Sequence, residues 1–277
     1  MSWLSIHFYP LEHQDVFLVR GLRPFLQQYI WANRGARAFF IRYQDEKGQH
    51  LRIRMRGEEA WKEETLRPAF EGWMEGRGEW QEQAYLPETA RFGGEEVLTL
   101  AESYFHLSSR VILDRLARDQ YTYGDAMFDA LRMHVIAVHA AGLKQKEAAH
   151  YFGQLMQQWL PLFFSGEADM PAEDQELILS GFASSLEPQV EDLRATLQEL
   201  WKALDRDKFD KEQPEWSRWA EGNRLIFKEY GPKLDMALPS LLHLSNNRLG
   251  LQNPDEVYVN FILSKVLAEP RPSGRGI

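Results

Sequence analysis

The periodicity of apolar residues changes once along this chain, and the change limits the folds open to it. Before residue 90, apolar and polar residues alternate in several short segments, which is the pattern of strands with one buried face. The clearest segment is "HLRIRMR", where three apolar residues separate one histidine and three arginines. After Gly93-Gly94, apolar residues recur every three or four positions, which is typical of amphipathic helices. The sequence therefore predicts a small sheet followed by helices.

The first part alternates strands and helices in a known order. Strands are predicted at 3–9, 37–43, 49–55 and 79–86, and helices at 14–32 and 58–74. The order strand-helix-strand-strand-helix-strand is that of a ferredoxin-like βαββαβ unit. Helices cover one sheet face in such a unit, so we expect the three arginines to lie on the open face.

The fold class predicted is α+β, with a ferredoxin-like unit at 1–92 and a mainly helical part at 93–277, together one compact domain. Helices in the second part are predicted near 95–118, 124–141, 144–164, 172–183, 186–206, 214–230 and 254–267.

Composition and charge exclude several classes of protein. The net charge of −9 argues against general nucleic-acid binding, although residues 20–56 hold nine Lys and Arg against two Asp and Glu. The chain has no cysteine, which excludes disulfides, thiolate metal sites and cysteine nucleophiles. No apolar run approaches ~20 residues and no signal peptide is evident, so a cytoplasmic location without a membrane span is expected. No metal or nucleotide motif occurs, and no metal is expected.

The arginines of the third predicted strand are the first candidate site. Arg52, Arg54 and Arg56 share one strand face, where neighbouring side chains lie only ~6.8 Å apart. A guanidinium binds a carboxylate or phosphate through two parallel hydrogen bonds. The alternative is a solvated or salt-bridged face, and the pattern alone leaves both interpretations open.

Two later segments hold further candidates. In "YLPETARFGG", Glu88 and Arg91 are three residues apart, and they form either a functional pair or a surface ion pair at a turn. In "LLHLSNNRLG", His243 and Asn247 are four residues apart and share one face of a helix. The histidine is either an acid/base group or a hydrogen-bonded core residue.

Taken in order, these segments resemble one family. The segments are "WLSIHFYP", "FFIRYQDEKGQHLRIRMRG", "YLPETARFGGEEVLTLAESYFHLSSRVIL" and "HLSNNRLGL". They resemble the C-terminal domain of class I lanthipeptide dehydratases, which also occurs as stand-alone thiopeptide-type bacteriocin biosynthesis proteins. The resemblance covers nearly the whole chain.

The resemblance implies a stand-alone elimination protein for ribosomal peptides. In the family, a partner esterifies serine or threonine of a precursor peptide with glutamate from glutamyl-tRNA. The elimination domain then removes glutamate and leaves dehydroalanine or dehydrobutyrine. The implied partners are a leader-core precursor peptide and a separate tRNA-dependent glutamylating subunit, with no direct nucleic-acid contact. No cofactor is implied, and a homodimer is the default expectation.

The resemblance also assigns roles by position. Catalytic roles fall to Arg54, Arg91 and His243, and substrate binding falls to Arg52, Glu88, Asn247 and Arg248. The arginines would hold the carboxylates of the glutamyl group, and the histidine would act as acid or base.

One departure from the family keeps two alternatives open. Ser108 stands in "AESYFHLSS" where the family often has aspartate, which raises the chance of a divergent activity. The first alternative is a thiopeptide pyridine synthase, which joins two dehydroalanines in a formal [4+2] cycloaddition. The second is a non-catalytic subunit that binds the precursor peptide or the glutamylating partner.

Overall fold

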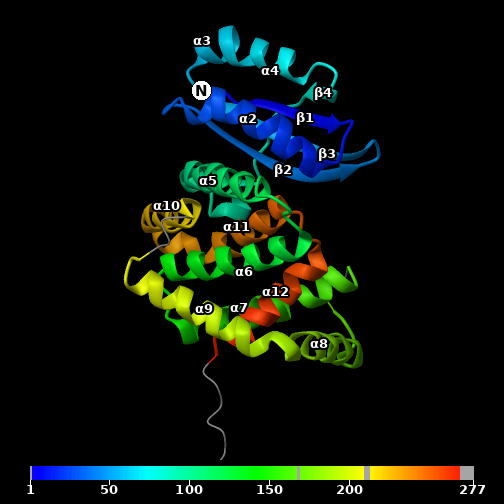
Figure 1. Cartoon of the computed structure of the whole chain (residues 1–277), viewed down its shortest axis with the longest axis vertical. Coiled ribbons are helices and arrows are strands. Elements are labelled where there is room, and N and C mark those ends of the chain that lie inside the picture. The colour runs from blue at the N-terminus through cyan, green and yellow to red at the C-terminus, as the bar shows by residue number, and fades with distance from the viewer. Residues whose placement is uncertain (1, 167–168, 209–212, 269–277) are drawn as a thin grey trace, which may run out of the picture. The chain divides into compact units, whose positions relative to one another are not determined.

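The computed structural model describes residues 2–166, 169–208 and 213–268, and the chain forms two compact units. The first comprises Met1–Thr122 and Leu225–Gly250, and the second comprises Tyr123–Arg224 and Leu251–Ile277. The chain is mostly helical, and the one sheet of its described part is N-terminal (Figure 1). The predicted division after residue 92 follows the change in periodicity and stays a prediction.

The first unit contains a four-stranded antiparallel sheet. Its strands are β1 (Leu4–Pro10), β2 (Arg37–Asp45), β3 (Gly48–Arg56) and β4 (Gly78–Glu82), in the spatial order β2-β3-β1-β4. Helical segments connect β1 to β2 and β3 to β4, as the periodicity predicts. β4 ends four residues earlier than predicted, because β1 begins at Leu4 and offers no partner beyond the level of Gln83.

Two composite helical segments connect these strands. The first runs through α1 (Gln14–Phe17), η1 (Leu18–Leu22), α2 (Arg23–Leu26) and η2 (Gln27–Trp31), and the second through α3 (Glu59–Trp61), η3 (Lys62–Leu66) and α4 (Arg67–Met74). Their η stretches are π-helical. Pro24 and Pro68 lie inside these continuous helical segments, each shortly after a π-helical stretch where the regular hydrogen-bond ladder is interrupted.

The apolar residues of β3 face these helices, as predicted. Leu51, Ile53 and Met55 are fully buried. On the same side of the sheet, the ring of Phe8 stacks on that of Phe17 with centroids 4.3 Å apart. Full burial of such a side chain contributes about 1.5–3 kcal/mol, so this layer anchors the first unit.

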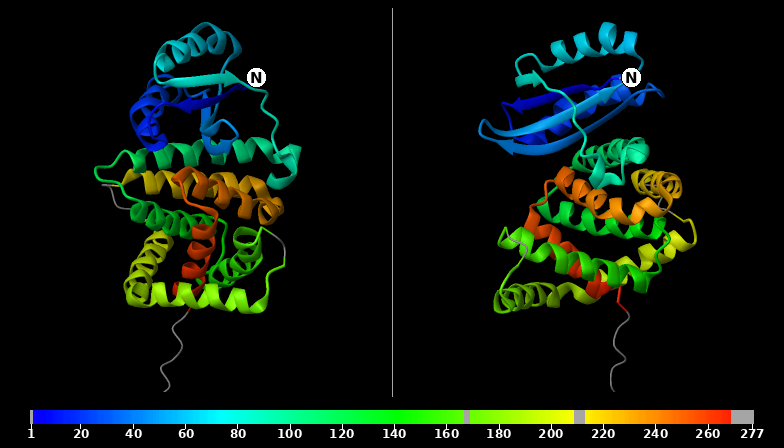
Figure 2. Two further views of the ribbon diagram at one scale, coloured as in Figure 1. Left: turned by 90° about the vertical axis from the view of Figure 1, so that its right-hand side faces the viewer. Right: turned by 180° about the vertical axis from the view of Figure 1, so that it is seen from behind.

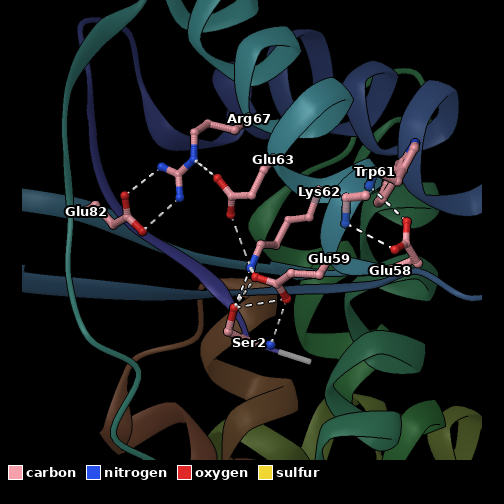
Figure 3. A network of polar contacts seen from close by, with 9 residues as sticks. Ser2, Glu58, Glu59, Trp61, Lys62, Glu63, Arg67 and Glu82 are labelled. Atoms are coloured by element: carbon pink, nitrogen blue, oxygen red, sulfur yellow. Dashed lines mark hydrogen bonds and ion pairs between the residues drawn. The ribbon is translucent and has the colours of Figure 1, made fainter.

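A polar network joins the second helical segment to β4 (Figure 3). Arg67 pairs with Glu82 through Nη1–Oε2 at 2.6 Å and Nη2–Oε1 at 3.2 Å, and its Nε donates to Glu63 at 2.7 Å. The buried Lys62 pairs with Glu59 at 2.7 Å. The chain before β1 also joins the network, because Ser2 Oγ contacts Glu59 and Lys62.

Further helices of the first unit pack beside the sheet. They are η4 (Thr89–Phe92), η5 (Glu95–Val97), α5 (Leu98–Leu116), η7 (Gly231–Lys233) and α11 (Leu234–Leu249). The last residues of α10 (Pro214–Tyr230), from Leu225 onward, also belong to this unit. Both α5 and α11 pack against β2 and against each other. Gly93 and Gly94, with φ of 94° and 107°, make the turn between η4 and η5 that the sequence predicts.

The second unit is helical. It contains α6 (Tyr123–Ala140), α7 (Gln145–Phe164), α8 (Ala172–Leu186), η6 (Glu187–Gln189), α9 (Val190–Asp205) and α12 (Asn253–Val266). α12 packs against α6, α7 and α9 (Figure 2). The apolar stripe of α9 buries Leu197, Trp201 and Leu204. In the described ranges, no helix has the length and apolar content needed to cross a membrane.

Candidate functional site

The three arginines of β3 lie on one sheet face, as predicted, with polar neighbours on β1. Arg52 is directly opposite His7, and Arg54 is directly opposite Ser5, in the antiparallel register of β1 and β3. Arg56 continues the row at the end of β3. We call this row, with its β1 neighbours, the arginine face.

Arg56 has a carboxylate partner on α5. Its Nη1 donates to Oε2 of Glu102 at 2.9 Å, and the other carboxylate oxygen accepts from Trp3 Nε1 at 3.1 Å. Glu102 is buried, and burial raises the pKa of its carboxyl although Arg56 acts in the opposite direction. The charge of Arg56 is therefore balanced within the fold. Nothing in the sequence alone singles out Glu102 as this partner.

Arg54 has no such partner. Its side chain is buried, with the residue 6% exposed, and its guanidinium carbon lies 5.5 Å from the ring centroid of Tyr85. In the described part of the chain, its Nε and Nη1 have no hydrogen-bond partner. Burial, with the nearby charge of Arg52, lowers its pKa to about 10.

The prediction of an open sheet face is therefore wrong at Arg54. The ring of Phe39, on the neighbouring strand β2, lies directly opposite Arg54 and is itself buried. Trp3 and Tyr85 pack edge-on against Phe39, with centroids 5.1 and 5.9 Å away. Aromatic side chains of the sheet's own strands and flanking segments thus cover the face that the periodicity left free.

Arg52 is half-buried and lies over an aromatic ring. Its guanidinium carbon is 3.3 Å from the ring centroid of Tyr43, which provides a cation–π contact. Its Nε is buried and, within the described residues, without a hydrogen-bond partner. Arg52 and Arg54 together therefore present three unpaired nitrogen donors on neighbouring guanidiniums, an arrangement suited to binding an anion.

Two histidines missed as candidates adjoin these arginines. The ring of His7 on β1 stacks on that of His50 on β3, with centroids 5.0 Å apart. Burial first, then the charges of Arg52 and Arg54, lower the pKa of His7 to about 4. Burial also lowers the pKa of His50. Both imidazoles are therefore neutral near pH 7 beside permanent cations. In "SIHFY" and "QHLRI", each histidine is followed by an apolar or aromatic residue of an alternating strand pattern. This pattern was the signal in the sequence that could have placed both histidines on the face of the arginines.

Two of the predicted binding residues hold the free edge of β2 instead. Asn247 accepts from the backbone N–H of Arg42 and donates to its carbonyl, both at 3.0 Å. Arg248 is fully buried and donates from Nε to the carbonyl of Phe40 at 2.8 Å. Burial lowers the pKa of Arg248 to about 9. Their observed hydrogen bonds are thus with backbone atoms. The guanidinium of Arg248 also lies 6.0 and 5.1 Å from the ring centroids of Phe39 and Phe105, and its Nη2 has no hydrogen-bond partner among the described residues.

Side chains of α5 also hydrogen-bond to this outer edge of β2. Ser109 Oγ accepts from the N–H of Phe40 at 3.3 Å, and a ring nitrogen of His106 lies 3.1 Å from the N–H of Ala38. Ser108, at the position where the family often has aspartate, is fully buried, and its hydroxyl donates to the carbonyl of Phe105 within the helix. Side chains of the "HLSS" segment therefore hydrogen-bond to the backbone of β2 and, in the case of Ser108, to the backbone of α5 itself.

Arg91 lies in η4 and forms an exposed ion pair. Its Nη1 donates to Oε2 of Glu88 at 2.8 Å, and the two side chains are 46% and 65% exposed. The next residue, Phe92, packs edge-on against Phe105 with centroids 5.0 Å apart, and Phe105 packs against Phe39 at 5.2 Å. Aromatic contacts thus link the segment of Arg91 to the residue opposite Arg54.

His243 is half-buried on α11, one turn before Asn247. α11 packs against η4, which carries Arg91, as well as against β2. The first unit thus gathers the elements of all seven predicted residues, with Arg52 and Arg54 side by side. Across the described ranges, no three His, Asp or Glu side chains cluster in a way that would hold a metal ion.

Comparisons with known proteins identify the family and the fold of the chain. The chain matches a family model described as "Lantibiotic biosynthesis dehydratase C-term" over residues 3–267. No curated protein matches it. Among solved structures, it is similar to the tRNA-dependent lantibiotic dehydratase MibB from Microbispora sp. 107891, with a TM-score of 0.67 and 21% identity. That match covers 96% of this chain but 28% of MibB.

Two further similar structures match over nearly their whole length. The pyridine synthase TbtD from thiomuracin biosynthesis has a TM-score of 0.74 at 15% identity, with 96% of this chain and 97% of TbtD covered. TsrL has a TM-score of 0.62 at 16% identity, with 95% and 93% covered. At these identities the likeness shows a shared fold. The family model confirms the resemblance found in the sequence: the chain belongs to the lantibiotic biosynthesis dehydratase C-terminal family.

Proposed function

We propose that this chain removes glutamate from O-glutamylated serine or threonine in a ribosomal precursor peptide, leaving dehydroalanine or dehydrobutyrine. The observation that carries the proposal is the unpaired state of Arg52 and Arg54. Their buried Nε atoms and Arg54 Nη1 have no partner among the described residues, whereas Arg56 is balanced by Glu102. Guanidiniums held in this way are suited to a ligand with carboxylates.

The proposed reaction is a β-elimination. A base takes the Cα proton of the esterified residue, the Cα–Cβ double bond forms, and the Cβ–O bond breaks. The electron pair leaves with the carboxylate of glutamate, and cations beside the departing carboxylate stabilise that charge. We assign this role to Arg52, Arg54 and Arg91, and proton transfer to His243.

The other predicted residues have supporting roles in this proposal. Glu88 orients Arg91 through their ion pair. Asn247 and Arg248 fix α11 to the edge of β2, and so position His243 one turn earlier on the same helix. We propose that these two residues act by positioning His243, and the substrate-binding roles that the resemblance implies stay a prediction.

The partners follow from the same proposal. MibB is described as tRNA-dependent, and we propose that a separate subunit performs such glutamylation here and that both act on one precursor peptide in the cytoplasm. A homodimer is also proposed. The observed strand order and helix placement support assignment of the N-terminal sheet to the ferredoxin-like class.

Intact-mass spectrometry tests the proposal directly. The probe is a synthetic peptide carrying one O-glutamylserine, mixed with the purified full chain. We expect the mass of glutamate to be lost together with formation of dehydroalanine, and thiol addition then identifies the new double bond. Hydrolysis would instead return serine, and an unchanged ester would contradict the proposal.

A pyridine synthase is the second candidate, favoured by one observation. The fold matches TbtD over 96% of this chain and 97% of TbtD, so each chain spans the other. A synthetic peptide with two dehydroalanines tests this function through a new absorbing ring and release of a peptide fragment. Arg54→Met would leave that reaction intact, since no glutamate is bound. Inactivity on both probes would favour a non-catalytic, peptide-binding subunit.

A further inference from the structure

The two edges of the sheet differ in how their backbone is satisfied. At β2, side chains of α5 and α11 bond to backbone groups of Ala38, Phe40 and Arg42. At β4, on the other edge, no equivalent side chain from the described residues does so. β4 is also the one strand of this sheet with no buried residue.

The register identifies the open groups of β4. Gln83 N–H bonds to the carbonyl of Ser5, and Leu11 N–H bonds to the carbonyl of Arg77. Hydrogen-bonded and non-hydrogen-bonded pairs alternate in an antiparallel ladder, so odd-numbered residues of β4 face β1. The N–H and C=O groups of Gly78, Trp80 and Glu82 therefore point outward, and in the described structure none of them has a hydrogen-bond partner.

We propose that the outer edge of β4 binds an extended segment of the precursor peptide as a fifth strand of the sheet. This inference rests on the proposed function for the identity of the peptide. A row of alternating N–H and C=O groups is matched by another extended backbone, and strand addition of this kind is a general mode of peptide recognition. The open edge has a use here that explains why it is not capped.

Continuity with the arginine face favours a substrate peptide as the occupant. Gln81 on β4 lies opposite His7 on β1, and His7 lies opposite Arg52 on β3, all on one face. Strands lie ~4.8 Å apart, so a strand added to β4 runs ~14 Å from β3. A few residues of the same peptide span that distance. Docking at β4 thus brings a neighbouring esterified residue to the arginines.

The side chains of β4 indicate what the added strand carries. On the helix side, Trp80 packs edge-on against Phe70 with centroids 6.1 Å apart, which offers apolar contact. On the arginine-face side, Glu79 is exposed and favours a basic residue. Glu82 is exposed but is paired with Arg67 (Figure 3). An extended peptide with β-branched residues and flanking lysines fits this edge.

A matched pair of variants at Glu82 tests the docking. Glu82→Ala and Glu82→Pro both lose the ion pair to Arg67, but only proline removes the outward N–H. The probe is a fluorescein-labelled peptide of alternating valine and threonine with a lysine at each end, measured by anisotropy with the full chain. We expect wild type and Glu82→Ala to bind alike, and Glu82→Pro to bind about tenfold more weakly.

A second measurement uses the wild-type protein alone, so it tests the proposal even if Glu82→Pro does not fold. Single N-methylation along the probe removes one donor at a time, and strand addition predicts weaker binding at every second residue only. Uniform sensitivity, no sensitivity, or equal binding by both Glu82 variants would overturn the proposal. A dimer that Glu82→Pro converts to monomer, without change in peptide affinity, would assign the edge to a second copy instead.

The same peptide separates this inference from the proposed function. Joined to the O-glutamylserine probe, the alternating segment should lower KM in wild type and in Glu82→Ala, and not in Glu82→Pro. If N-methylation weakens binding at every second residue but no elimination occurs, docking at β4 is supported and the eliminase is rejected. Elimination with no effect of N-methylation or of Glu82→Pro would retain the eliminase and reject the docking.

Discussion

Arg54 and Arg56 lie two residues apart on one strand face, yet the fold treats them differently. Arg56 keeps part of its side chain in solvent and has the buried carboxylate of Glu102 at 2.9 Å. Arg54 is more deeply buried, and its guanidinium lies near the ring of Tyr85 and the charge of Arg52. A chain selected for stability alone would not bury the second guanidinium, because unpaired buried charge costs free energy.

The difference shows which part of the arginine face the fold completes by itself. Glu102 accepts hydrogen bonds from Trp3 and Arg56, and its carboxylate also bonds to the side chain of Tyr85. Arg52 and Arg54 keep buried nitrogen atoms without hydrogen-bond partners among the described residues, and their guanidiniums contact the rings of Tyr43 and Tyr85. The incomplete part is therefore where function is to be sought, and each test below separates it from the completed part.

The largest effect is expected from Arg54→Met. Methionine keeps an apolar side chain in place but removes the charge, so kcat/KM for the O-glutamylserine peptide should fall about 100-fold. Stability should stay level or rise by up to about 1 kcal/mol, since two unpaired buried N–H groups disappear. Steady-state kinetics and urea unfolding measure both. Unchanged kcat/KM would remove Arg54 from the site.

Glu102→Gln tests the completed part. Glutamine still accepts from Trp3, but Arg56 loses its counter-charge, and the free energy of unfolding near pH 7 should fall by about 2 kcal/mol. The estimate is below the fully buried case because Arg56 is 22% exposed. Glu102→Gln with Arg56→Met should recover much of the loss. Additive losses in this double-mutant cycle would mean that the two groups do not depend on each other.

Periodicity was sufficient to predict the sheet, its helical connections and most helices after Gly94 to within a few residues, but no predicted range covered α11 (Leu234–Leu249). The burial of Leu51, Ile53 and Met55 followed from the same alternation. It could not predict that the opposite face is covered, because Trp3 precedes β1, Phe39 lies on β2, and their contacts depend on register. Local patterns report which face of a strand a residue occupies, and not what lies across from it.

The candidate site was predictable in part for the same reason. The row of arginines is local and was found, whereas Glu102 acts across 46 residues of sequence and was not. The binding role of Asn247 and Arg248 was predicted from the family resemblance, and their polar side chains stand out in an otherwise apolar helix. β2 is an edge strand, so the backbone groups on its outer side have no partner strand in the described sheet. Asn247 and Arg248 are polar because their side chains supply hydrogen bonds to these groups.

Asn247→Ala tests that reading against the behaviour expected of Arg54. The N–H and C=O of Arg42 would each lose a partner, and the free energy of unfolding should fall by about 1–2 kcal/mol. Below the denaturation range, KM for the peptide probe should stay within a factor of about two. Chemical denaturation and kinetics on the same sample decide the matter. A large rise in KM without loss of stability would return Asn247 to the substrate-binding residues.

The smallest effect concerns His7, which faces Arg52, Arg54, His50 and Asp45. Its pKa is about 4 in the folded chain and 6.5 as a free group, so the unfolded chain binds more protons between these values. Its contribution to stability is therefore intact above about pH 6.5 and is lost as the pH falls toward 4. His7→Phe should flatten this loss by less than about 1 kcal/mol, because the ring is partly exposed. Unfolding measured at intervals from pH 7.5 to 4.5 compares the stability curves of wild type and His7→Phe.

Parallel curves would mean that the folded environment does not resist a further cation at the position of His7. The charges of Arg52 and Arg54 would then be balanced by some group after all, and their contrast with Arg56 would lose its basis.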